Sequence, residues 1–207
     1  MKRLAVGTAL MVVGLAIGAS AAQAQVWAVP KGVGVTVAGD FNLSLADGSP
    51  NWIDGRVALG LPMVGFQATF TPNALDAAEN NIGVDAAVQL IPMPVSVRVQ
   101  AGARYGTDSK TFMVPAGVVI GLNVPSPMLS VDPFIFPQVR YTHFDGGGSN
   151  TDFGVTAGLN IGLPSGLGGH IAVDYDNALK KVLDFKSAVT VAVGVHYRIS
   201  VPSLGMM

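Results

Sequence analysis

The stretch SAVTVAVGVHYRI, residues 187–199, alternates strictly between two kinds of side chain. The apolar set is Val189, Val191, Val193, Val195, Tyr197 and Ile199. The residues between them are small or polar: Ala188, Thr190, Ala192, Gly194, His196 and Arg198. A period of two predicts a β-strand with one apolar face and one small, polar face. The fold then depends on whether the apolar face meets a protein core or lipid.

The same pattern recurs along the chain and predicts about ten strands. The expected segments are 33–43, 52–61, 64–71, 82–90, 95–105, 112–122, 134–144, 151–161, 170–176 and 187–199. Their connections alternate in kind: every second one carries Pro62, Pro92 and Pro94, Pro125 and Pro127, or Pro164, and the others are polar. An up-and-down meander whose two ends face different environments has this alternation. Pro115 and Pro137 fall inside expected strands, where each removes a ladder donor, so a bulge or eight strands is the alternative.

Composition narrows the class of protein. The chain has 207 residues, half of them hydrophobic and only 12% charged, with a net charge of −1. The apolar content is too high for a disordered chain, and no basic stripe indicates a nucleic-acid partner. The sequence has no cysteine, which excludes disulfides, thiol catalysis and Cys-bearing zinc sites. We expect no metal and no cofactor.

The first segment has the pattern of a secretory signal. Lys2 and Arg3 precede an apolar stretch, and Ala22-Gln23-Ala24 fits a small-x-small cleavage site. We therefore expect residues 1–24 to be a signal peptide and 25–207 to form a single domain outside the cytoplasm.

Aromatic residues gather near the strand ends that border the polar loops. Because neighbouring strands alternate in direction, these ends fall on one rim, where a membrane barrel has its interfacial girdle. The expected girdle consists of Phe41, Trp52, Phe70, Tyr105, Phe112, Tyr141, Phe144, Phe153, Tyr175 and Phe185.

Lipid is the favoured partner of the apolar faces. Strands of about 9 to 11 residues match a tilted bilayer crossing. The apolar faces are almost free of charge, as expected where Arg or Lys at mid-bilayer costs roughly 2–4 kcal/mol. We therefore predict an all-β, antiparallel, up-and-down transmembrane β-barrel of about ten strands, with eight as the alternative.

With its signal segment, alternating strands, aromatic rim and short turns on one side, the sequence resembles the small outer-membrane β-barrel proteins of Gram-negative bacteria. The resemblance covers nearly all of the mature chain and lies in pattern, not in a residue motif. It implies a cell outer-membrane location, Pro-bearing turns in the periplasm and polar loops outside. We expect outer-membrane lipid as a partner, with small polar solutes as a second class of partner for the lumen.

Charged residues on the inward faces form the candidate site. Both signs occur in similar number, so an ion-pair network inside the barrel is the main expectation. Asp40 with Arg56, and Asp85 with Arg98, are the expected cross-strand neighbours. Inward Gly and Ala, such as Gly194, leave room that water or small solutes could use. The expected network consists of Asp40, Asp54, Arg56, Asp85, Arg98, Arg104, Arg140, Asp152, Asp174, His196 and Arg198, with His170 beside them.

The predicted function is an integral outer-membrane barrel, structural or weakly pore-forming, without catalytic activity. One alternative is a soluble periplasmic or secreted barrel that binds an apolar ligand inside, which would reverse every inward and outward assignment. A remote alternative is an outer-membrane hydrolase that uses His143, Asp145, Asp174 and Asp176 near one rim to activate water.

Overall fold

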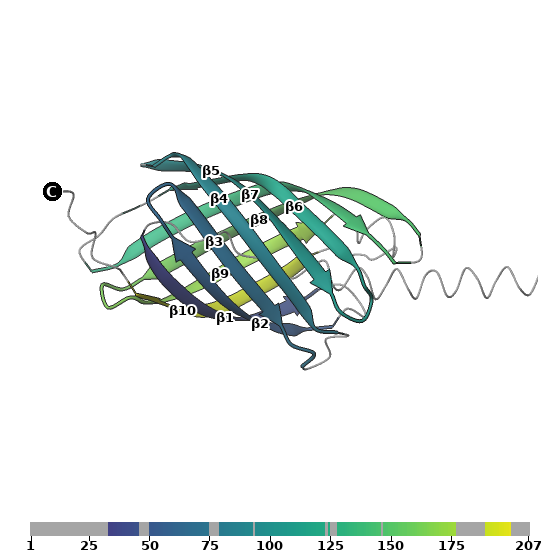
Figure 1. Cartoon of the computed structure of the whole chain (residues 1–207). Helices are drawn as coiled ribbons and strands as arrows, with labels where there is room; N and C mark the ends of the chain where they lie inside the picture. The colour runs from purple at the N-terminus through teal and green to yellow at the C-terminus, as the bar shows by residue number, and fades with distance from the viewer. Residues whose placement is uncertain are drawn as a thin grey trace, which may run out of the picture.

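The chain forms a closed, antiparallel barrel in which each strand pairs with its neighbours in sequence and the last pairs with the first (Figure 1). The computed structural model describes residues 33–45, 50–74, 79–92, 94–122, 124, 128–145, 147–176 and 189–199. The strands are β1 Gly34–Ser44, β2 Trp52–Gly60, β3 Val64–Thr71, β4 Asn81–Ile91, β5 Val95–Gly106, β6 Phe112–Leu122, β7 Ser130–His143, β8 Ser149–Gly162, β9 Leu167–Asp176 and β10 Val189–Ile199.

The predicted all-β up-and-down barrel of ten strands is confirmed, and the eight-strand alternative is wrong. The expected signal peptide, residues 1–24, lies outside the described residues. In the part of the chain that is described, no helix has the length and hydropathy of a membrane span.

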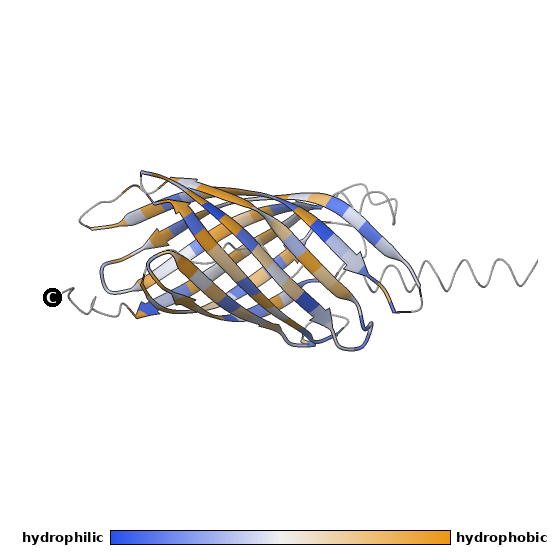
Figure 2. Cartoon of the chain, turned by 45° about the horizontal axis from the view of Figure 1, so that its top comes forward, coloured by the Kyte–Doolittle hydropathy of each residue, from blue (hydrophilic) through white to orange (hydrophobic). Residues whose placement is uncertain are grey.

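Alternation sets which side chains point inward. Along β2, every residue from Trp52 in steps of two is buried and every residue between is exposed. The exposed set is apolar, as at Ile53 and Val57, and the buried set includes Asp54 and Arg56. All Asp and Arg residues of the strands lie on the inward face, so the barrel has a largely polar interior, here called the lumen, and an apolar outer wall. Hydrophilic and hydrophobic residues alternate along the strands (Figure 2).

The internal prolines interrupt the ladder without a bulge. Between β5 and β6 the pairing stops after Ala101–Ala116 and resumes at Arg104–Met113 in the same register, across the site of Pro115. Between β6 and β7 a similar gap spans Pro137. Proline has no N–H to donate, which accounts for the interruption of the ladder. Each gap is local, because Pro115 still pairs with Arg140 of β7 and Pro137 still pairs with Val155 of β8. The register shift lies elsewhere, between Gln89 and Ile91.

Two rims differ in their connections. The β2–β3, β4–β5, β6–β7 and β8–β9 turns (61–63, 92–94, 123–129 and 163–166) form the turn rim, and the other connections form the loop rim. At the turn rim, Leu61 N–H donates to Val64 O at 2.8 Å and closes a two-residue hairpin turn. Gly166 has φ of +89°, and its carbonyl accepts from Arg198 N–H at 2.8 Å, so the β8–β9 turn is attached to the end of β10.

Candidate functional site: a packed polar lumen

The expected charged residues all lie on the inward face. Ten are between 1% and 7% exposed: Asp40, Asp54, Arg56, Asp85, Arg98, Arg104, Arg140, Asp152, His170 and Asp174. His196 and Arg198 are half-buried near the turn rim. The structure therefore places the predicted set inside one lumen and distributes it among several clusters.

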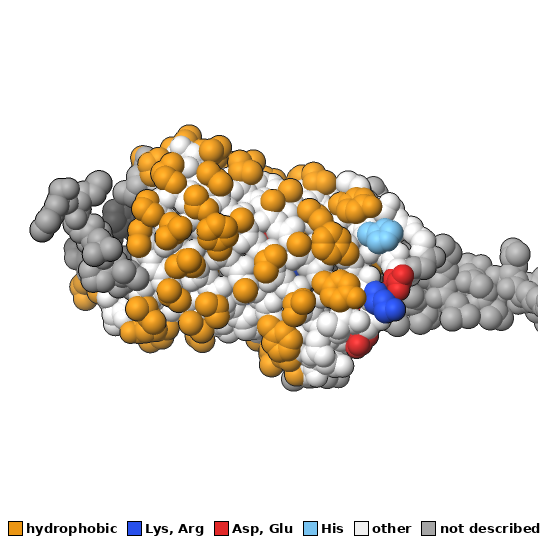
Figure 3. All heavy atoms as spheres, viewed as in Figure 1, with side chains coloured by type: hydrophobic (Ala, Val, Ile, Leu, Met, Phe, Trp, Pro, Cys, Tyr) orange, Lys and Arg blue, Asp and Glu red, His pale blue; other side chains and the backbone are white. Residues whose placement is uncertain are grey.

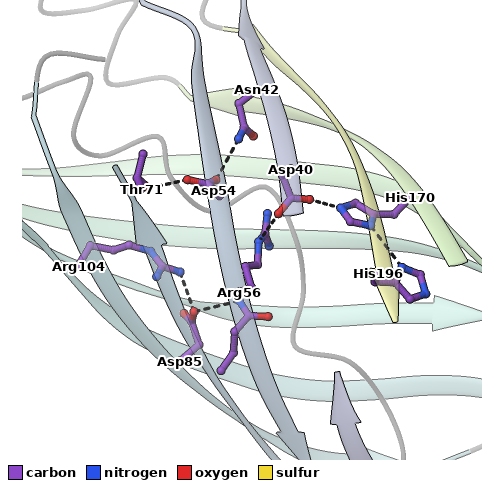
Figure 4. Close-up of polar contacts among 10 residues, drawn as sticks. Asp40, Asn42, Asp54, Arg56, Thr71, Asp85, Arg104, His170 and His196 are labelled. Carbon is purple, nitrogen blue, oxygen red and sulfur yellow. Dashed lines mark hydrogen bonds and ion pairs between the residues drawn. The ribbon is translucent and has the colours of Figure 1, made fainter. Parts of the chain in front are cut away.

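Asp40 is the centre of the first cluster (Figure 4). One of its carboxylate oxygens lies 2.6 Å from Arg56 Nε, and the other contacts His170 Nε2. His196 stacks on His170 with ring centroids 5.7 Å apart. The sequence expected the Asp40–Arg56 contact; the two histidines extend it toward the turn rim.

Asp54 belongs to a neighbouring polar cluster. It accepts hydrogen bonds from Asn42 Nδ2 at 2.9 Å and from the Thr71 hydroxyl at 2.5 Å. Both donors are buried, and they come from β1 and β3 on either side of β2. The carboxylate therefore ties three successive strands together from inside the lumen.

The expected pairing of Asp85 with Arg98 is wrong. Asp85 instead accepts from Arg104 at 2.7 Å. In the β4–β5 register Arg98 lies opposite Gln89, and Asp85 lies opposite Gly102. The register of the two strands, and not charge alone, determines which side chains become neighbours.

Arg140 is the centre of a further ion-pair cluster in the lumen. Its two terminal nitrogens donate to Asp176 and Asp174, each at 2.6 Å. Asp174 also accepts from the Thr156 hydroxyl at 2.5 Å, and Gln138 donates to that hydroxyl at 3.1 Å. Arg140 and Gln138 come from β7, Thr156 from β8 and the acids from β9, so the network spans three strands.

Inward glycines make these contacts possible. A Cβ at Gly194 on β10 would lie 2.5 Å from His170 Nε2 and closer still to Asp40 Oδ1. Gly194 is the register partner of both residues, on strands to either side, so their contact passes directly over it. A Cβ at Gly154 on β8 would lie 2.8 Å from Arg140 Cζ, where Arg140 reaches across β8 to β9. The expectation that Gly194 leaves space for solvent is therefore wrong, because side chains from the flanking strands fill that space.

An apolar cluster fills another part of the lumen. Phe134 and Phe136 point inward from β7, at 7% and 1% exposure, with Val119 of β6 beside them. The same cluster contains alanines of β1, β9 and β10. Since β7 and β1 lie four steps apart around the ring of strands, this cluster extends across much of the lumen.

Sequence reasoning missed three of these buried side chains. Two of them could have been found from the alternation of the strand. Phe134 and Phe136 lie an even number of residues from Arg140 on β7, so they face inward as it does. Glu79 was not found either: it is 2% exposed and accepts from the backbone N–H groups of Asp108 and Ser109 at 2.8 and 2.7 Å. This carboxylate holds the β5–β6 loop against the β3–β4 connection, a role that no strand pattern reveals.

The aromatic residues of the expected girdle divide into three groups. Seven are on the outer wall at 39–50% exposure: Phe41, Phe70, Tyr105, Phe112, Tyr141, Phe153 and Tyr175. Phe144 follows β7 and is half-buried, and Phe185 lies outside the described residues. Trp52 is wrongly assigned, because it is 3% exposed and faces inward with Asp54, two residues away on the same strand.

The rim residues of the hydrolase alternative are not brought together. His143 is exposed on the outward face, whereas Asp174 and Asp176 point inward and bind Arg140. Asp145 lies 3.6 Å from Lys110 on the loop rim. Among the described residues, no group of three or more His, Asp or Glu side chains is arranged to hold a metal ion.

Comparisons with known proteins give fold-level likeness. No protein-family model matches the sequence, and no curated protein matches it. A structure from a study of de novo designed transmembrane β-barrels has 14% identity and a TM-score of 0.40, covering 83% of this chain and all of its own. The KdgM porin has 12% identity and a TM-score of 0.43, covering 79% of this chain and 99% of its own. Omp33, an outer membrane protein of Acinetobacter baumannii, has 8% identity and a TM-score of 0.41, covering 81% and 98%.

Proposed function

We propose that the chain is an integral outer-membrane β-barrel whose role is structural and whose lumen conducts small polar solutes weakly at most. The observation that carries this proposal is the outer wall: no outward-facing position of the ten described strands holds Asp, Glu, Lys or Arg. A hydrocarbon environment requires such a wall, because charged side chains there cost roughly 2–4 kcal/mol each at mid-bilayer.

The extent of the apolar wall argues against water outside. Thirty-nine large apolar side chains, each 37–79% exposed, are present among the described residues. At about 70 Å² apiece they present on the order of 2,500 Å², several times the largest apolar patch of a typical soluble monomer. The soluble alternative requires the apolar faces to point inward, and they have the opposite orientation.

The lumen contents favour a structural role over free conduction. Ion pairs pass over inward glycines, and Phe134 and Phe136 belong to a cluster that extends across the interior. Several buried polar atoms have no hydrogen-bond partner in the described part of the chain, among them Trp52 Nε1, Thr69 Oγ1 and Asn81 Oδ1. Buried polar atoms of this kind favour bound water, so limited passage of small polar solutes remains part of the proposal.

Two measurements test the proposal. The first is the mobility of the outer-membrane fraction in SDS gels with and without boiling, where a closed membrane barrel stays folded until boiled and then shifts. The second is ion flux through the purified protein in planar bilayers, where we expect no large, long-lived conductance. Recovery in the soluble periplasmic fraction without a gel shift would refute the membrane barrel, and large stable conductance steps would refute the filled lumen.

A further inference from the structure

The turn rim has an unusual composition for a rim that faces water. Segments 61–63, 90–95, 122–131 and 163–167, which are the turn rim and the strand residues that border it, contain Leu, Ile, Met, Val, Pro, Ser, Gly and one Asn, and no Asp, Glu, Lys or Arg. Ordinary turns are rich in polar residues because their backbone and side chains meet solvent. This rim therefore continues the composition of the outer wall.

Apolar side chains of the turn rim and of the strand ends beside it are exposed. Those with the clearest exposure are Leu61 at 43%, Met63 at 50%, Leu90 at 58%, Ile91 at 50%, Met128 at 79% and Leu163 at 46%. On the face drawn in Figure 3, hydrophobic side chains reach the turn end, and the charged ones gather at the opposite end. The described charges of that loop rim include Asp108, Lys110 and Asp145.

The height of the barrel places the turn rim at a boundary. Ten residue steps separate the outward Tyr105 from Val95 on β5, and ten separate Phe112 from Leu122 on β6. At about 3.4 Å per residue and a tilt of about 40°, ten steps rise about 26 Å along the barrel axis. Outer-membrane barrels have an apolar band about 25 Å tall. If the outward aromatics lie at one headgroup level, the band ends at the β4–β5 and β6–β7 turns.

We propose that the turn rim is a lipid-binding surface, with the exposed Leu, Ile and Met side chains of its described residues inserted among acyl chains at the edge of the membrane. This inference rests on the proposed function, since it requires the outer wall to be in lipid. The occupant is lipid because the apolar surface of the rim continues without a break from that wall and ends at the height of the band.

The polar mouth limits how deep the rim lies. Arg198 and His196 are half-buried at this end of the lumen, and Arg198 donates to Val33 O at 3.3 Å. Burying this end of the lumen in hydrocarbon would remove Arg198 from water at a high free-energy cost. We therefore expect the mouth of the lumen to meet water while the turn tips around it meet acyl chains. The turns are also fixed in place: Met63 O accepts from Gln89 N–H at 2.8 Å, which binds the β2–β3 turn to β4.

Single cysteines give a clean test, because the chain has none of its own. Spin labels at Met63→Cys and Met128→Cys report the turn rim, Ser149→Cys is the exposed loop-rim control, and Val195→Cys is the mid-wall reference. Each full-length variant is reconstituted in phospholipid vesicles, and relaxation of the label by oxygen is compared with relaxation by a polar nickel chelate. Oxygen partitions into hydrocarbon and the chelate does not, so the oxygen-to-nickel ratio at both turn sites should exceed that at Ser149 on the order of tenfold.

The other outcomes separate the explanations. A ratio at Met63 and Met128 equal to that at Ser149 would mean that the turns are in water and would overturn the inference. Labels that neither reagent reaches would mean that protein, such as residues 200–207 or a second copy, covers the rim, and would also overturn it. A low ratio at Val195 would refute the membrane barrel itself, whereas a high ratio there with low ratios at the turns would refute only the rim.

Discussion

Replacing Gly194 with Ala tests the packing of ion pairs over inward glycines. The added Cβ would lie 2.5 Å from His170 Nε2 and 2.6 Å from Gly39 O, and closer to Asp40 Oδ1. The backbone carbonyl of Gly39 belongs to the β1–β10 ladder, so the side chains must give way and the Asp40–His170 contact must break. Asp40 retains Arg56, so the loss is one charge-assisted hydrogen bond, about 1.5–3 kcal/mol, with about 1–3 kcal/mol of overpacking added.

The total loss is about 4 kcal/mol, which at a urea slope of about 2 kcal/mol per M lowers the unfolding midpoint by about 2 M. The assay is urea unfolding of the protein in lipid vesicles, followed by tryptophan emission. Gly39→Ala is the matched control, because its Cβ would face outward with Asp54 O at 3.8 Å as the nearest atom. Removing this strand glycine should stabilise by about 0.5–1 kcal/mol. Equal midpoints for the two variants would refute the reasoning.

Three further substitutions probe the wall, the loop rim and the lumen. Val195→Arg, at an outward site 66% exposed, should cost about 2–4 kcal/mol and remove the heat-dependent gel shift; an unchanged shift would place this face in water. Glu79→Gln should weaken the attachment of the β5–β6 loop by about 1–2 kcal/mol and speed tryptic cleavage after Lys110, and a cleavage rate equal to that of the parent would count against the attachment. Phe136→Ala should raise ion flux in planar bilayers while destabilising the barrel by about 3–5 kcal/mol, and a destabilised barrel with unchanged flux would mean that the apolar cluster does not obstruct the lumen.

Alternation alone predicted the barrel, because burial on one side of each strand imposes a period of two on the residue types. The bounds of β3 and β6 agree with the expected segments 64–71 and 112–122. β7 begins at Ser130 and not at 134, so Asp132 and Pro133 belong to the strand, and Asp132 has the same parity as the inward Phe134. Trp52 lies near a strand end, which is typical of girdle residues, but it has the same parity as Asp54 and therefore faces inward.

The contacts inside the lumen were less predictable than the faces. Asp40 and Arg56 lie on the paired strands β1 and β2, where Arg56 is two residues from Asp54, the register partner of Asp40. Asp85 finds Arg104 and not Arg98 because that choice depends on the β4–β5 register. The contact of Asp40 with His170 joins strands that are not neighbours in the sheet, and a pattern read along single strands carries no information about such pairs.

The inward glycines also bear on how the strands find their alignment during assembly. A slip of one residue turns each face over, and alternation of apolar and polar residues already opposes it. A slip of two residues leaves every side chain on its original face, so the alternation of apolar and polar residues does not oppose it. If β10 slipped by two against β1, Ala192 or His196 would replace Gly194 beneath the Asp40 carboxylate, where no Cβ fits. The glycines thus select against even-numbered slips, and the two patterns together specify one alignment.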